Sequence, residues 1–175
     1  MTRGTEIIIG LAGRKRSGKT SAAEILRIAF AREGYEPIRF GFTDFLKSKV
    51  SEITGGLSDT DKCMVRPALQ NLADFLKQRY GERYFINQWH EIYHVFLERG
   101  VNVFIIDDVR YPFEADWIKE QGGLVLKMVR DGDTDQNDQH PSETSVDDIQ
   151  AEEWTLPALN AYREFVAGEI IEKLS

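Results

Sequence analysis

Cysteine is almost absent from this chain of 175 residues, since Cys63 is the only one. A single cysteine cannot form an internal disulfide, and it excludes a zinc site built from several cysteines. Long apolar runs are also missing, because none approaches the roughly 20 residues that cross a bilayer. Arg14, Lys15 and Arg16 interrupt the apolar N-terminal stretch where a signal peptide would have its core. We therefore expect a soluble protein of a reducing, cytoplasmic compartment.

Positive charge is the minority, with 22 Lys and Arg against 29 Asp and Glu and a formal net charge of −7. This balance disfavours a broad surface for nucleic acids or acidic membranes, which needs clustered basic residues. The charges are uneven along the chain, however. Residues 1–20 hold five basic side chains and one acidic side chain, whereas residues 131–153 hold nine carboxylates and no Lys or Arg. The pattern predicts a local positive site for a small anion such as a nucleotide.

The hydrophobic pattern alternates between the two regular periods, and 175 residues with 42% hydrophobic content suffice for one domain. Short apolar runs predict strands at 7–11, 37–42, 101–107 and 123–129. Helical spacing is found at 20–33, from 44, at 61–80, 86–99, 112–121 and 156–174. The alternating order predicts a mostly parallel sheet with helices on both faces, a three-layer α/β/α fold. The polar stretch 131–144 has no periodicity and is expected to be a loop, the best candidate for a lid.

The segment from Gly13 to Thr20 reads G-R-K-R-S-G-K-T, directly after an apolar strand and before a helix. This is the G-x-x-x-x-G-K-[ST] order of a P-loop. Its backbone N–H groups wrap phosphates, its lysine reaches the terminal phosphates, and its hydroxyl binds Mg²⁺. A glycine-containing turn without a ligand is the alternative. The residues predicted to bind ATP here are Gly13, Arg14, Arg16, Ser17, Gly18, Lys19, Thr20 and Ser21.

Asp107 and Asp108 end the apolar run of the third predicted strand. In P-loop proteins a carboxylate at this position holds Mg²⁺ beside the loop hydroxyl. Thr20, Asp107 and Asp108 are therefore the candidate metal residues. The alternative is that one of the aspartates only caps the helix that begins near Pro112.

Two arginines lie where ligands bind in open α/β sheets. Arg110 follows the aspartates and is a candidate to clamp a phosphate, and a salt bridge to Glu114 is the alternative. Arg130 lies where the last of these strands enters the loop at 131–144, a natural place to meet ATP on closure.

Several motifs together resemble the phage deoxynucleoside monophosphate kinases, within the wider nucleoside monophosphate kinase group. The resemblance covers most of the chain. In the N-terminal half it rests on residues 13–19, on Phe42-Thr43-Asp44-Phe45-Leu46-Lys47, on Arg66 with Leu69-Gln70 and on residues 81–89. In the C-terminal half it rests on residues 108–112 with Glu114-Ala115, on Gly122-Gly123 and on His140-Pro141-Ser142-Glu143. Two positions depart from the family. Thr20 stands where the family commonly has Asp, and Ala73-Asp74 replaces a frequent Gly-Thr, which bears on base specificity.

The resemblance implies a P-loop kinase of 1–175 as one domain, with a helical acceptor-binding segment at about 43–100 and a lid at about 131–145. It implies transfer of the γ-phosphoryl group of ATP, with Mg²⁺, to a deoxynucleoside 5′-monophosphate. The catalytic residues would be Lys19, Arg110, Asp108 and Arg66. The acceptor-side residues would be Phe42, Asp44, Lys47, Arg66, Gln70, Arg79, Arg83, Trp89, Glu114, His140, Ser142 and Glu143.

Other functions stay open at this point. The same kinase chemistry fits another acceptor, such as dephospho-coenzyme A or a hydroxymethylated base in DNA, although the acidic balance weighs against DNA. A nucleotide-dependent switch protein is the alternative from a different class. Related enzymes are often dimers, which leaves a homodimer open. If the chain is encoded by a phage, the expected compartment is the cytoplasm of the host.

Overall fold

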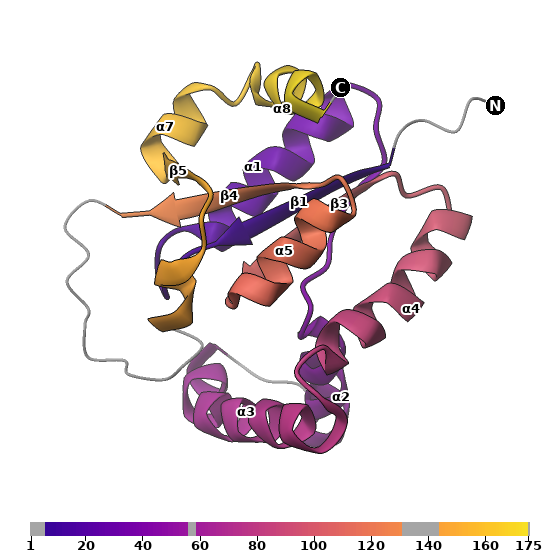
Figure 1. Ribbon diagram of the computed structural model, residues 1–175, viewed down its shortest axis with the longest axis vertical. Coiled ribbons are helices and arrows are strands. Elements are labelled where there is room, and N and C mark those ends of the chain that lie inside the picture. Colours follow the sequence, from indigo (N-terminus) through magenta and orange to yellow (C-terminus); the bar gives the residue numbers. More distant parts are fainter. Residues whose placement is uncertain (1–5, 56–58, 131–143, 175) are drawn as a thin grey trace. The chain divides into compact units, whose positions relative to one another are not determined.

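The computed structural model describes residues 6–55, 59–130 and 144–174 (Figure 1). The chain forms two compact units, one of residues 1–41 with 96–175 and one of residues 42–95. None of the helices in the described ranges combines the length and the apolar character needed to cross a bilayer.

The first unit contains a five-stranded sheet in which every neighbouring pair is parallel. The strand order is β2-β3-β1-β4-β5. The strands are β1 (Ile7–Ala12), β2 (Pro37–Arg39), β3 (Val103–Val109), β4 (Leu124–Val129) and β5 (Glu152–Thr155). The central strand β1 and its neighbour β3 are buried almost throughout, which is why β1 and the first four residues of β3 are apolar runs in the sequence. The expectation of an α/β fold with a parallel sheet is confirmed.

Helices cover both faces of this sheet. Alternate residues of β1, beginning with Ile7, share one core with α1 (Lys19–Arg32), α7 (Leu156–Ala161) and α8 (Val166–Leu174). On the other face, a Cβ built on Gly10 would lie 2.5 Å from Cδ1 of Ile118 in α5 (Pro112–Glu120). Because side chains alternate along a strand, these contacts place α1, α7 and α8 opposite α5. The arrangement is compatible with a P-loop kinase-like fold.

The second unit is helical, with α2 (Asp44–Thr54), α3 (Asp59–Tyr80) and most of α4 (Tyr84–Glu98). Aromatic rings form its interior. Phe42 packs edge-on against Trp89, and Phe45 contacts both Tyr84 and Phe85. Phe42, Phe85 and Trp89 are each 1% exposed. The unit therefore has an apolar core of its own.

Two elements differ from the sequence expectation. The predicted helix 156–174 is interrupted, since α7 ends at Ala161 and α8 begins at Val166. No Gly or Pro stands between them, so no local signal marks the break, which lets both short helices pack on α1. The edge strand β5 was not expected, because its residues Glu-Glu-Trp-Thr end an acidic stretch and show too few apolar residues for a strand pattern. A 3₁₀ turn, η1 (Ser145–Asp148), precedes it.

Replacing Gly123 by alanine is expected to lower the free energy of unfolding by about 1–3 kcal/mol. A Cβ there would lie 2.6 Å from the carbonyl oxygen of Ile8 and 3.0 Å from that of Ile118, and backbone cannot yield as a side chain can. Gly168→Ala is the matched control, because nothing lies within 4 Å of its Cβ position in α8. That variant is expected to gain about 0.5–1 kcal/mol from helix propensity. Urea unfolding measures both, and an unchanged midpoint for Gly123→Ala would contradict the close approach.

Candidate functional site

The candidate site lies at the carboxyl ends of β1 and β3, which are neighbours in the sheet. After β1 the chain passes through α1 to β2 on one side, and after β3 it passes through α5 to β4 on the other. The two connections thus leave adjacent strands in opposite directions and over opposite faces. In open α/β sheets this reversal opens the crevice in which ligands bind.

The loop from Gly13 to Gly18 joins β1 to α1. Its backbone bends sharply, with φ of 146° at Gly13, 64° at Arg16 and 93° at Gly18. At Gly13 a side chain has no room either, because a Cβ would lie 2.5 Å from the carbonyl oxygen of Met128. Arg16 is the one non-glycine residue with positive φ in the described part of the chain. A strained, tightly packed loop of this kind is typical of functional sites.

Lys19 is the first residue of α1 and is 7% exposed. Its ammonium folds back over the loop, where Nζ donates to the carbonyl oxygens of Gly13 and Arg14 at 2.7 Å each. Ser17 Oγ lies 3.5 Å from the same nitrogen. The first turn of α1 has no acidic side chain, so its backbone donors and this cation present positive charge together.

Thr20 and Asp107 meet across the crevice. The hydroxyl of Thr20 donates to Oδ2 of Asp107 at 3.3 Å, and Asp107 is only 5% exposed. Nε of Arg39, at the end of β2, donates to the same oxygen at 2.8 Å. A buried carboxylate is stable when paired in this way. The result is an oxygen pair, one hydroxyl and one carboxylate, beside the β1–α1 loop.

The two aspartates at the end of β3 are placed differently because the strand register shifts there. Gly10 pairs with Ile106, but Ala12 pairs with Val109, so β3 has one extra residue opposite Leu11. Bulges of this kind re-aim side chains next to active sites. Asp107 reaches Thr20, whereas the carboxylate of Asp108 packs on Gly41, where a Cβ would lie 2.6–2.7 Å from its three carboxyl atoms.

Glu114 caps α5. Its Oε2 accepts hydrogen bonds from the backbone N–H of Arg110 at 2.7 Å and from that of Tyr111 at 3.1 Å. These donors lie at the helix start, where a carboxylate also complements the dipole. The N-cap of α5 is Tyr111, so the capping contacts come from Glu114 and not from the aspartates of β3.

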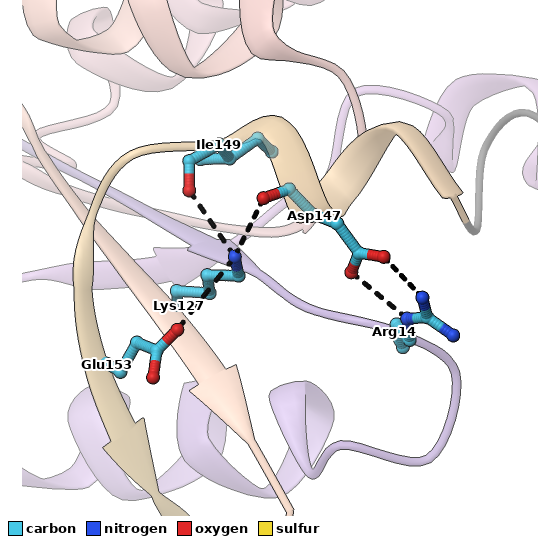
Figure 2. A network of polar contacts seen from close by, with 5 residues as sticks. All are labelled: Arg14, Lys127, Asp147, Ile149 and Glu153. Atoms are coloured by element: carbon cyan, nitrogen blue, oxygen red, sulfur yellow. Dashed lines mark hydrogen bonds and ion pairs between the residues drawn. The ribbon is translucent and has the colours of Figure 1, made fainter. Parts of the chain in front are cut away.

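Arg14 of the loop and Asp147 of η1 form an ion pair (Figure 2). Arg14 Nε donates to Oδ1 of Asp147 at 3.0 Å, and Nη2 donates to Oδ2. These hydrogen bonds hold the pKa of Asp147 below its usual range, so the carboxylate is ionised at neutral pH. Lys127 of β4 fixes the η1 turn from the other side, donating to the carbonyl oxygen of Asp147 at 3.1 Å and to that of Ile149 at 3.5 Å.

The expected acceptor-side residues with described side chains lie mostly in the second unit. Asp44 and Lys47 pair with each other at 2.7 Å on the first turn of α2. Arg79 lies over the ring of Tyr80, with 5.5 Å from its guanidinium carbon to the ring centroid. Gln70 lies half-buried on α3, Arg83 is exposed between α3 and α4, and Phe42 and Trp89 are core residues.

Other expected site residues are placed only in part. The backbone of Arg66 lies on α3, but its side chain is outside the described structure. His140, Ser142 and Glu143 lie outside the described residues altogether. Ser21 is exposed on the first turn of α1, and Arg130 is exposed directly after β4.

Sequence reasoning missed three residues that the structure brings to this region: Arg39, Lys127 and Asp147. Arg39 lies 68 positions from Asp107 in the chain, and Asp147 lies 133 positions from Arg14. No motif marks any of them. For Asp147 alone there was a weak signal: residues 131–153, which include it, have a surplus of carboxylates, and residues 1–20, which include its partner Arg14, have a surplus of basic side chains.

Comparison with curated proteins finds a relative that is 28% identical over 178 residues, covering 91% of this chain and 92% of the relative. It is a protein of Acanthamoeba polyphaga mimivirus named "Putative deoxynucleotide monophosphate kinase". Among solved structures, the crystal structure of APE1195 is 15% identical, covers 98% of both chains and has a TM-score of 0.47. No family model matches the sequence. The chain is therefore similar, over nearly its whole length, to a viral protein named as a nucleotide kinase.

Proposed function

We propose that this protein is a deoxynucleoside monophosphate kinase, which transfers the γ-phosphoryl group of ATP to a deoxynucleoside 5′-monophosphate and forms the diphosphate and ADP. The observation that carries the proposal is the position of Lys19, whose ammonium covers the β1–α1 loop at 2.7 Å from two loop carbonyls. The similarity to a viral protein named as a nucleotide kinase supports the same class of reaction.

The donor phosphates would lie in the β1–α1 loop, at the N-terminus of α1. Lys19 would exchange its loop carbonyls for phosphate oxygens, because a polyphosphate is a stronger acceptor for an ammonium than a neutral carbonyl is. Backbone N–H groups of residues 17–20 would donate to the same phosphates. Arg14 and Arg16 would add charge from the loop itself, and Ser21 and Arg130 would be further contacts of the donor.

The residues present fit a Mg²⁺ ion. Thr20 and Asp107 offer oxygen ligands, which Mg²⁺ prefers, and their oxygens lie 3.3 Å apart. The described residues contain no group of three His, Cys, Asp or Glu side chains that could hold a metal ion. Mg²⁺ in kinases is typically held by one or two protein groups and by substrate phosphates, so two suffice. Thr20 and Asp107 would hold the ion, which would supply positive charge to neutralise the phosphates, and Asp108 would be a further carboxylate of this site.

The acceptor needs no strong general base, because its attacking group is already an anionic phosphate. Catalysis then consists of positioning and of neutralising developing charge. Arg110, beside the carboxyl end of β3, and Arg66 of α3 would supply that charge. The acceptor side would be completed by Asp44, Lys47, Gln70, Arg79 and Arg83, with Phe42, Trp89 and Glu114 as structural support. His140, Ser142 and Glu143, which lie outside the described residues, would also belong to it.

A single assay tests the proposal. The protein is incubated with ATP and Mg²⁺ and each of the four deoxynucleoside monophosphates in turn, and the nucleotides are then separated. We expect a deoxynucleoside diphosphate from at least one acceptor, with ADP formed in equal amount. Formation of ADP without any deoxynucleoside diphosphate would point instead to a switch protein that hydrolyses nucleotides slowly. Parallel incubations replace the monophosphate by dephospho-coenzyme A or by DNA, and a product formed only there would keep the kinase chemistry and change the acceptor.

A further inference from the structure

We propose that Asp147 is a positioning residue for the donor site: it fixes the Arg14 side chain in the β1–α1 loop, so that the guanidinium is presented to the donor phosphates. This inference rests on the proposed function, because it takes the loop to be the phosphate site. No motif led to Asp147, and its role follows from three features of the structure.

The first feature is the geometry of the pair. Asp147 engages Arg14 through both Nε and Nη2, so the contact is bidentate and sets the plane of the guanidinium as well as its position (Figure 2). The contact with Asp147 uses Nε and Nη2. A guanidinium is a planar fork whose geometry matches both carboxylate and phosphate, so an arginine that is oriented by a carboxylate is suited to binding a phosphate as well.

The second feature is that the backbone around Asp147 is held in place by contacts that do not involve Arg14. Its neighbours Val146 and Ile149 are 0% and 2% exposed, which anchors the η1 turn in the core. Lys127, whose side chain is 16% exposed, bonds the backbone carbonyls of Asp147 and Ile149 from β4. The carboxylate therefore has a fixed support, whereas Arg14 belongs to a loop. We therefore infer that Asp147 sets the orientation of the Arg14 guanidinium, and not the reverse.

The third feature links this pair to Lys19. The backbone carbonyl of Arg14 accepts a hydrogen bond from Lys19 Nζ at 2.7 Å. Contacts therefore run from Lys127 through the η1 turn and Asp147 to Arg14, and from Arg14 to the loop lysine. Both pair members are partly exposed, with side chains 35% and 49% accessible, so the effect on affinity is expected to be moderate.

Binding of inorganic triphosphate, measured by isothermal titration calorimetry, tests the inference. Asp147→Asn is expected to weaken binding about three- to fivefold, as for loss of one partly exposed ion pair. Arg14→Ala is expected to weaken it about 10- to 100-fold, since it removes a charged donor. Because Asp147 acts through Arg14, adding Asp147→Asn to Arg14→Ala should change nothing further. Asp148→Asn removes the same charge from the next residue of η1 and is expected to leave binding within about twofold.

The kinase assay gives a second readout. The KM for ATP should rise in Asp147→Asn by the factor seen in binding, while kcat and the KM for the accepted monophosphate stay unchanged. If Asp147→Asn weakens triphosphate binding by disturbing the structure generally, it will also weaken binding when it is added to Arg14→Ala. That result would overturn the inference. Tighter binding by Asp147→Asn would also overturn it, since Asp147 would then compete with phosphate for Arg14. If Lys19→Ala abolishes triphosphate binding but Asp147→Asn does not alter it, only this inference fails. If the wild-type protein binds no triphosphate, both it and the proposed function fail.

Discussion

Replacing Lys19 by alanine is expected to lower kcat for diphosphate formation about 100- to 1,000-fold, the usual cost of removing one preorganised charge from a transition state. Phosphoryl transfer spreads negative charge over the transferred group, and little covalent chemistry is available to compensate. Lys19 is the cation best placed for this role among the described residues of the loop. It is buried, it begins α1, and its ammonium already covers the loop.

Two further variants make the Lys19 result specific. Lys19→Arg keeps the charge but replaces a compact ammonium by a larger, planar guanidinium, so its rate is expected to lie between those of Lys19→Ala and the wild-type protein. Arg27→Gln removes a charge from the same helix, where Arg27 pairs with Glu24 on the surface, and is expected to leave kcat unchanged. Circular dichroism and thermal unfolding check that each variant is folded. A folded Lys19→Ala protein with full activity would refute the proposed function.

The elements that the sequence predicted well are those determined locally. The strand, loop and helix around Gly13 to Lys19 follow from a buried apolar run, from glycines at bends and from helical spacing, all within about 25 neighbouring residues. The same holds for β3 and β4, which begin with the apolar runs 103–106 and 124–126. Their parallel order followed from the helices between them.

The elements that it missed depend on contacts between distant segments. β5 is an edge strand, so it pairs with one neighbouring strand and few of its side chains need to be buried. Its two glutamates continue an acidic stretch of the sequence, which shows no strand pattern. The break between α7 and α8 is set by packing on α1 and carries no local breaker. In both cases tertiary structure overrode the local pattern, as it regularly does for short segments.

Side-chain roles were harder to predict than elements. A strand ending in two aspartates left open which one would face Thr20, and the answer depends on a register shift that no residue type signals. Glu114, which the sequence offered as a salt-bridge partner of Arg110, also accepts a hydrogen bond from the backbone N–H of Arg110, a contact that no sequence pattern predicted. Arg39 and Asp147 entered the site only because the fold brings segments 68 and 133 positions apart together.

Asp107→Asn is the other variant with a large expected effect. We expect kcat to fall about 100-fold, and the Mg²⁺ concentration that gives half-maximal activity to rise at least about tenfold, as for other losses near a metal site. The physical reason is that the amide keeps the shape but loses the charge that would attract a cation. Asp107 is also the acceptor shared by Thr20 and Arg39, so the amide presents a weaker acceptor to both.

The Mg²⁺ titration separates the roles of the two aspartates. Asp108→Asn is expected to have the smaller effect on Mg²⁺ dependence, since its carboxylate packs against Gly41, whereas Asp107 is bonded to the Thr20 hydroxyl. The reverse ranking would move the metal position to Asp108 and contradict the assignment of Asp107.

A binding measurement excludes a purely structural explanation for Asp107→Asn. Calorimetry with ATP in EDTA and with ATP in Mg²⁺ compares affinity without and with the metal. Wild-type protein is expected to bind the Mg²⁺ form more tightly, and Asp107→Asn is expected to lose most of that difference while it keeps or improves binding of metal-free ATP, because one negative charge near the phosphates is gone. Loss of the paired buried carboxylate should also lower the free energy of unfolding by about 1–3 kcal/mol, which thermal unfolding measures. A variant that is equally destabilised but retains the wild-type Mg²⁺ preference would show that Asp107 supports the fold and does not bind the metal.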